Sequence, residues 1–134
     1  MNKKDIHVIY GNQPKKMVQE LLTHLNLAES LLQEGFDKNI KIGIKPNLVV
    51  AKTSTSGATT SPEMVAAVIE YLQAAGFKNV CILEGSWVGD RTSAAFKVCG
   101  YEDISRRYNV PLYDLQKDSY QTYEVDGVKI NVCD

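Results

Sequence analysis

A lysine, an asparagine and a run of hydroxyl side chains lie in one stretch of the sequence, where their chemistry suits the binding of an anion. Lys45 is followed by a proline and Asn47, and the segment Gly57-Ala58-Thr59-Thr60-Ser61-Pro62 comes shortly after. A helix that begins at Pro62 would add unpaired backbone N–H groups to the ammonium and the hydroxyls. These groups together suit a phosphate or a carboxylate. A simpler alternative stays open, in which Ser61 only caps this helix and Lys45 is a solvated lysine.

A second polar stretch, at residues 84–92, contains an acid, a serine, two glycines, the single tryptophan and an arginine. Glu84 could contact a ligand hydroxyl, bind a metal or act as an acid or base. Trp87 could stack on a ring, and Arg91 could pair with an anion through two hydrogen bonds. The alternative is that Glu84 forms a structural ion pair with Lys45 or Arg91.

Both stretches follow predicted strands, and ligands of parallel sheets bind beyond the carboxyl ends of the strands. Neither stretch has the glycine spacing of a phosphate loop or of a dinucleotide-binding turn. Lys45 and Glu84 are the candidate catalytic residues, and no set of metal ligands is predicted. The ligand-binding residues that we expect are Lys45, Asn47, Gly57, Thr59, Thr60, Ser61, Glu84, Gly85, Ser86 and Arg91.

Strand-like and helix-like segments alternate along the chain and must position these loops. The predicted strands are 6–10, 40–44, 79–83 and 111–115. The predicted helices are 14–34, 62–75, 92–99 (capped by Thr92) and 101–108. Such alternation produces parallel pairing through right-handed crossovers. We therefore predict a single α/β domain over residues 1–134, with a three-layer, mostly parallel, Rossmann-like sheet, helices on both faces and a closing β-hairpin.

The hairpin is predicted from residues 122–125 and 128–132, which flank Asp126-Gly127, a type I′ turn signal. A hairpin at an unprotected edge is a poor place to finish a domain, so we expect the chain to be the N-terminal part of a longer protein. A simple closing hairpin is the alternative. Tyr113, Tyr120 and Tyr123 could form an exposed patch here that contacts the rest of the protein or a second copy.

Composition narrows the possible partners and the location. The 15 Lys and Arg residues nearly balance the 16 Asp and Glu residues, so we expect no nucleic-acid binding. Apolar runs are too short to span a membrane and no signal segment precedes the first strand, so we expect a cytoplasmic protein. Cys81, Cys99 and Cys133 are too far apart for a short metal-binding pair, and we expect reduced thiols. His7 and His24 are expected at core or surface positions.

Several strings in this sequence resemble the domain-of-unknown-function 362 family. They are 44–49 (Ile-Lys-Pro-Asn-Leu-Val), 57–63 (Gly-Ala-Thr-Thr-Ser-Pro-Glu), Glu84-Gly85 and the segment from Phe96 to Tyr101. Members of that family are generally longer, and some carry ferredoxin-type iron–sulfur segments. The present chain lacks the clustered cysteines of such a segment. The resemblance implies no settled activity, but it supports a longer protein and adds weight to six site positions. These positions are Lys45, Asn47, Thr59, Thr60, Glu84 and Gly85.

The function that we expect is binding of a small anionic metabolite or cofactor at the carboxyl edge of the sheet. The chain would then be part of a larger enzyme, with a redox-linked reaction as one option. In that reading Lys45 neutralises the anion, Asn47 orients it, and Glu84 contacts a hydroxyl or serves as the acid or base. The alternative is a non-catalytic assembly module that docks through its C-terminal hairpin. The substrate, the reaction and the cofactor stay open.

Overall fold

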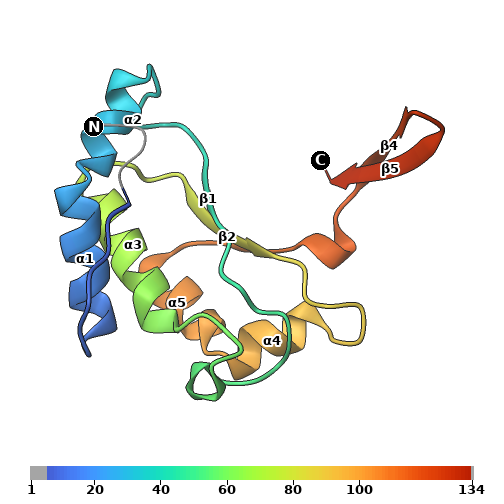
Figure 1. The fold of residues 1–134 in the computed structure, drawn as a ribbon, viewed down its shortest axis with the longest axis horizontal. Helices are drawn as coiled ribbons and strands as arrows, with labels where there is room; N and C mark the ends of the chain where they lie inside the picture. The colour runs from blue at the N-terminus through green and yellow to red at the C-terminus, as the bar shows by residue number, and fades with distance from the viewer. Residues whose placement is uncertain (1–5, 134) are drawn as a thin grey trace.

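Three short parallel strands form the centre of the fold in the order β1-β2-β3 (Figure 1). The computed structural model describes residues 6–133. The strands are β1 (Ile42–Ile44), β2 (Val80–Glu84) and β3 (Leu112–Asp114). Ile44 pairs with Ile82, and Ile82 pairs with Leu112. Since all three strands run in the same direction, their carboxyl ends meet at one edge. The predicted α/β fold with a parallel sheet is confirmed.

Helices precede and connect these strands. They are α1 (Pro14–His24), α2 (Leu27–Gln33), α3 (Pro62–Ala74), α4 (Thr92–Val98) and α5 (Tyr101–Tyr108), with short 3₁₀ turns η1 (Ser54–Ser56) and η2 (Leu115–Lys117). The single helix predicted for 14–34 is wrong, because the chain breaks at Asn26, which has a φ of 49°. Asparagine tolerates this left-handed conformation, and a helix cannot continue through it.

The hydrophobic core lies between one face of the sheet and the helices. Helix α3 contributes Val65, Ile69 and Leu72, which lie on one face at steps of four and three. The strands contribute every second residue, since successive side chains of a strand point to opposite faces. These strand residues are Ile42, Ile44, Val80, Ile82 and Leu112. Helix α1 packs on α3, outside this core (Figure 1).

The other face of the sheet is open over part of its area. Lys41 and Gly43 are exposed there, and the Lys41 ammonium lies 4.7 Å from the centroid of the Tyr113 ring. Leu83 lies across Gly43, where a Cβ would come within 2.6 Å of the Leu83 Cδ2. The described residues therefore show helices packed in the core on one face. A third layer stays a prediction.

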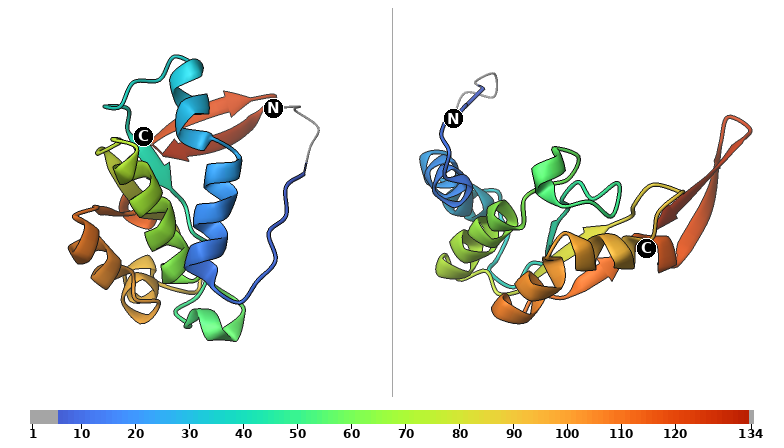
Figure 2. Two further views of the ribbon diagram at one scale, coloured as in Figure 1. Left: turned by 90° about the vertical axis from the view of Figure 1, so that its left-hand side faces the viewer. Right: turned by 90° about the horizontal axis from the view of Figure 1, so that it is seen from below.

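The segment 6–10, predicted as the first strand, belongs to no sheet in the structure. It runs in an extended form beside α1 on the side away from α3 (Figure 2). The ring of His7 contacts that of His24 in α1, and the two ring centroids lie 5.0 Å apart. Ile6, Val8 and Tyr10 are exposed. The prediction is wrong because alternating apolar residues allow an extended backbone, but a strand also needs a neighbouring edge, and α1 separates this segment from the sheet.

The C-terminal hairpin is confirmed. It consists of β4 (Tyr120–Val125) and β5 (Val128–Cys133), paired in antiparallel fashion, and it projects away from the sheet and helices (Figure 1). Asp126 and Gly127 have φ values of 52° and 77°. Positive φ at both central residues is what a type I′ turn requires.

Glu70 of α3 connects α1 and α5 to the central helix. Its carboxylate accepts hydrogen bonds from Lys15 Nζ at 2.7 Å, Gln19 Nε2 at 3.1 Å and the Tyr108 hydroxyl at 2.5 Å. The hydrogen bond from Lys15, followed by that from Tyr108, lowers the pKa of Glu70 below its ordinary value of 4.5. The ionised form therefore stabilises the packing of these three helices.

Replacement of this carboxylate should have a pH-dependent effect on stability. A group with a lowered folded-state pKa stabilises the protein above its unfolded-state pKa, and this stabilisation is lost as the pH falls through the folded-state pKa. We expect Glu70→Gln to be less stable than the wild type near pH 7, with the difference shrinking below about pH 4.5. Urea unfolding at a series of pH values measures it. Glu20→Gln is the control, because Glu20 is an exposed carboxylate on α1. If the difference in stability between Glu70→Gln and the wild type does not change with pH, the role given to the ionised Glu70 carboxylate is contradicted.

Candidate functional site

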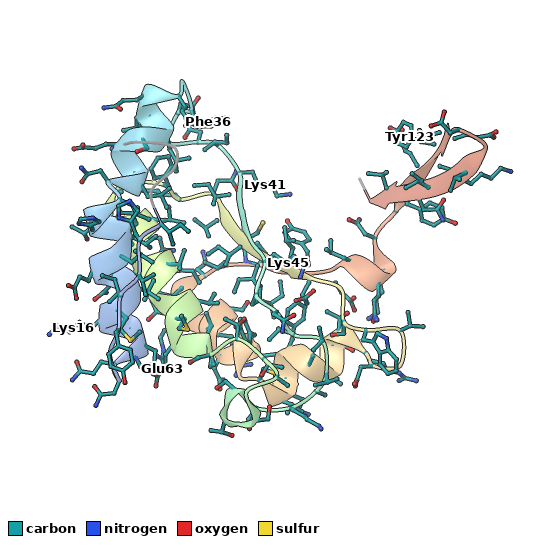
Figure 3. All side chains as sticks on the ribbon, in the orientation of Figure 1. Lys16, Phe36, Lys41, Lys45, Glu63 and Tyr123 are labelled. Carbon is teal, nitrogen blue, oxygen red and sulfur yellow. The ribbon has the colours of Figure 1, made fainter. Side chains whose placement is uncertain are left out.

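The two polar loops leave the sheet from the same edge. Lys45 directly follows β1, and Glu84 is the last residue of β2, the neighbouring parallel strand. Figure 3 shows Lys45 at the point where β1 ends, near the middle of the molecule. The sequence-based expectation that loops 45–61 and 85–91 lie side by side therefore holds at the strand ends.

Glu84 is buried and fully paired. Its side chain is 2% exposed, and its Oε1 accepts hydrogen bonds from Lys45 Nζ at 2.9 Å and from the Gly85 N–H at 2.8 Å. Its Oε2 accepts the Leu48 N–H at 2.8 Å. A buried carboxylate requires such partners, because removal from water costs several kcal/mol. The alternative in which Glu84 pairs with Lys45 is the one observed, whereas Arg91 is exposed outside this pair.

Side chains of the second loop continue the β1–β2 pairing beyond the ends of the strands. The ladder cannot continue through Pro46, which has no N–H. Instead, the Glu84 carboxylate accepts a hydrogen bond from the N–H of Leu48, and the Ser86 hydroxyl donates one to the Leu48 carbonyl at 2.7 Å. Backbone pairing then resumes, with the Trp87 N–H donating to the carbonyl of Val49 at 3.1 Å. The two loops are therefore joined by hydrogen bonds beyond the ends of β1 and β2.

The first loop is closed by its own polar groups. The Asn47 N–H donates to Thr60 Oγ1 at 2.9 Å, and the Thr60 N–H donates to the Asn47 carbonyl at 2.9 Å. The side chain of Asn47 also donates to the Ala58 carbonyl at 3.0 Å, and the Thr59 hydroxyl donates to the Lys52 carbonyl at 2.9 Å. Thr59 is buried, so its hydroxyl acts within the loop rather than toward a ligand.

Two buried side chains fix this loop to the helices. The Tyr101 hydroxyl at the start of α5 donates to the Thr60 carbonyl at 3.1 Å. Burial raises the pKa of Tyr101 above its ordinary value of 10.0, which keeps the hydroxyl protonated as a donor. The Cys99 thiol donates to the Lys52 carbonyl at 3.0 Å. The loop is therefore anchored at both its ends and its middle.

The second loop is closed by Thr92 and by Gln116, a residue that the sequence reasoning missed. Thr92 Oγ1 accepts the Ser86 N–H at 3.0 Å, and the Thr92 N–H donates to Gln116 Oε1 at 3.1 Å. Gln116 Nε2 donates to the carbonyls of Ser86 and Asp90, both at 3.0 Å. Thr92 was predicted to cap α4, but the cap position is Arg91 and no side chain caps the helix. The position of Gln116 just beyond β3, at the same edge, is the signal that could have identified it.

The remaining predicted residues lie farther from the ion pair. Ser61 occupies the position before α3, as predicted, but its side chain makes no capping hydrogen bond. Gly57 follows η1 with a φ of 75° and is exposed. The start of α3 instead borders a cavity of about 520 Å³, whose lining includes Glu63 of α3 and Arg107 of α5. Neither Lys45 nor Glu84 lines that cavity. The structure thus unites the two charged residues and places the helix start at a separate opening.

Two further observations concern residues 6–133 as a whole. Over this range, no three or more His, Cys, Asp or Glu side chains lie together in a way that could hold a metal ion. None of the helices in the same range is long and apolar enough to cross a membrane. Cys81 and Cys99 are free and buried, and burial raises the pKa of Cys81 above its ordinary value.

The protein is an α/β domain, and two polar loops at the carboxyl edge of its parallel sheet are hydrogen-bonded to each other. The chain belongs to the family described as "Domain of unknown function (DUF362)", whose model matches residues 42–134. The match begins at the first residue of β1 and includes both loops and the hairpin. No curated protein and no solved structure matches the chain.

Loss of the buried carboxylate should destabilise the protein strongly. Glu84→Ala leaves the N–H groups of Leu48 and Gly85 without an acceptor. Because an unsatisfied buried donor costs about 1–3 kcal/mol, we expect a loss of about 2–5 kcal/mol in the free energy of unfolding. Lys45→Ala should cost about 1 kcal/mol or less, because Lys45 is 57% exposed and Glu84 keeps its two backbone partners. Urea denaturation measures both.

Asp103→Ala is the matched control, since Asp103 is an exposed carboxylate that pairs with Arg106 on the same helix. Its effect should lie within about 0.5 kcal/mol of zero. Equal losses for Glu84→Ala and Asp103→Ala would show that Glu84 does not hold the loops.

Proposed function

We propose that the carboxyl edge of the sheet binds a small anionic metabolite or cofactor, and that this chain forms part of a larger, cytoplasmic enzyme. The observation that carries the proposal is the state of Lys45. Its ammonium is held 2.9 Å from a buried carboxylate, yet 57% of its side chain remains exposed. A cation in this position is both oriented and accessible.

The hydrogen-bond inventory of the edge supports Lys45 as the main contact. An ammonium has three protons, and Glu84 Oε1 accepts one of them, so the group has the capacity to donate to a further acceptor. Orientation by Glu84 reduces the side-chain entropy that binding would otherwise cost. Glu84 also offsets part of the positive charge, but its own charge is shared with two backbone N–H groups. The expected affinity is therefore moderate and weakened by salt.

In this proposal Glu84 is a positioning residue, because its oxygens are already occupied and its side chain is buried. Lys45 is the group that contacts the ligand, and the exposed Asn47 beside it supplies an amide that can orient the ligand. The open sheet face at Lys41, Gly43 and Tyr113 is where further parts of a larger protein would complete a three-layer, Rossmann-like arrangement. Some members of the domain-of-unknown-function 362 family carry iron–sulfur segments, and this favours a redox-linked reaction.

Anion binding should depend on Lys45 and not on other surface lysines. A panel of phosphate, citrate and sugar phosphates is tested by thermal unfolding of the wild type, where a ligand at one hundred times its Kd adds about 2.7 kcal/mol of stability. We expect Lys45→Ala to lower the affinity at least tenfold. Lys78→Ala, an exposed lysine just before β2 at the opposite edge, should bind like the wild type. The proposal is contradicted if the anions stabilise both variants equally. It is also contradicted if no anion stabilises the wild type.

A second candidate function, assembly through the hairpin, is favoured by the distribution of its side chains. Register places Tyr123 opposite Ile130 and Val125 opposite Val128, so these four side chains share one face. The other face carries polar pairs, such as Glu124 with Lys129. All four apolar side chains are exposed. Because an isolated two-stranded hairpin is marginally stable, this apolar face is the part of the hairpin that a partner or the rest of the protein would cover.

Assembly through this face should be sensitive to a charge placed on it. We expect the wild type to show a mass that rises with concentration in light scattering, and Ile130→Lys to remain monomeric. Asn131→Lys places the same charge on the opposite face and should behave like the wild type. A wild type that stays monomeric at every concentration excludes self-assembly through the hairpin.

A further inference from the structure

The single tryptophan of the chain is exposed at the same edge as Lys45. Trp87 is 66% exposed, and its neighbours Val88 and Val49 are 95% and 39% exposed. The hydrogen bond from the Trp87 N–H to the Val49 carbonyl, at 3.1 Å, brings the two loops together here. We refer to Val49, Trp87 and Val88 as the Trp87 patch. Three apolar side chains are thus presented to solvent beside a polar, charged edge.

The indole of Trp87 rests on Gly89, and this contact restricts its position. A Cβ at Gly89 would lie 2.5 Å from the Trp87 Cζ3 and 2.9 Å from its Cε3. The ring can therefore occupy this place only because residue 89 has no side chain. Restriction of the ring before binding lowers the entropy that stacking would cost. Most of the indole surface remains open, and aromatic stacking favours a flat ligand over it.

The Trp87 patch and the Lys45 ammonium belong to the same two bonded loops. Three peptide units separate the Cα atoms of Glu84 and Trp87, which limits their separation to about 11 Å. The ammonium in turn contacts the carboxylate of Glu84 at 2.9 Å. Asn47 lies on the first loop between Lys45 and Val49. A flat apolar surface and a cation are therefore carried by one pair of bonded loops.

We propose that the ligand of this edge is an aromatic anion, with a planar ring that stacks on Trp87 and a phosphate or carboxylate that binds Lys45. This inference rests on the proposed function, because it takes the anion site at Lys45 as one half of the site. Nucleoside monophosphates and aromatic carboxylates share the required chemistry. A sugar phosphate lacking a ring system would use only the Lys45 half.

The test compares AMP, ribose 5-phosphate, adenosine and benzoate by titration calorimetry, with the fluorescence of the single tryptophan as a second readout. We expect AMP to bind at least tenfold more tightly than either ribose 5-phosphate or adenosine, and to quench Trp87. Comparison of benzoate with acetate measures the contribution of the ring when the anion is a carboxylate. Tighter binding of benzoate than of AMP would assign the site to aromatic carboxylates.

Gly89→Ala tests whether the position of the Trp87 ring matters for binding, because it leaves Lys45 and Trp87 themselves unchanged. Gly89 is not among the glycines with positive φ, and the conflicting atoms belong to an exposed ring, so the fold should accept the change. We expect Gly89→Ala and Trp87→Leu to lower AMP affinity to that of ribose 5-phosphate, while ribose 5-phosphate itself binds as before. Ser93→Ala, at an exposed position of α4, should leave both affinities unchanged.

The failures of the two proposals are distinguishable. Equal affinities for AMP and ribose 5-phosphate in the wild type, both reduced by Lys45→Ala, would overturn the aromatic ligand and leave the anion site standing. Equal affinities for AMP and adenosine, both insensitive to Lys45→Ala, would overturn the anion site together with the aromatic anion. Absence of binding by every ligand would overturn both.

Discussion

The buried carboxylate of Glu84 holds the carboxyl edge of the sheet together. It accepts hydrogen bonds from the Lys45 side chain, the Leu48 N–H and the Gly85 N–H, and it thereby joins the ends of β1 and β2. Pro46 makes this necessary, because β1 cannot continue its ladder through a residue without an N–H. A charged side chain thus replaces a missing backbone hydrogen bond, and the position of both loops depends on it.

This construction also limits what the edge can bind. The N–H groups of Asn47, Leu48, Gly85, Ser86 and Trp87 are already donated to acceptors within the protein. An anion would therefore find few of the free backbone donors that phosphate loops provide. The groups that remain available are exposed side chains, above all Lys45 and Trp87. The proposed recognition by a cation and a ring, rather than by a backbone cradle, is consistent with how the loops are built.

The sheet and the hairpin leave apolar surface uncovered in the described part of the chain. Tyr113 borders the open sheet face, and the hairpin presents Tyr123, Val125, Val128 and Ile130 on one side. The family match runs through these same elements, from residue 42 to residue 134. The matched segment therefore includes both the polar edge and the elements that carry the exposed apolar surface.

Local sequence determined those features whose cause lies within a few residues. The strand β2 at an apolar run, the start of α3 at a proline and the turn at Asp126-Gly127 each follow from short-range conformational preference. The sequence predicted that Lys45 and Glu84 lie at one edge of a parallel sheet, with the ion pair as one alternative for Glu84. The strand order that makes the two residues neighbours was decided by the tertiary structure. Tertiary structure alone decided that residues 6–10 join no sheet, that Gln116 closes the second loop and that Trp87 rests on Gly89. Each of these outcomes depends on which distant groups come into contact, and side-chain type along the sequence does not specify that.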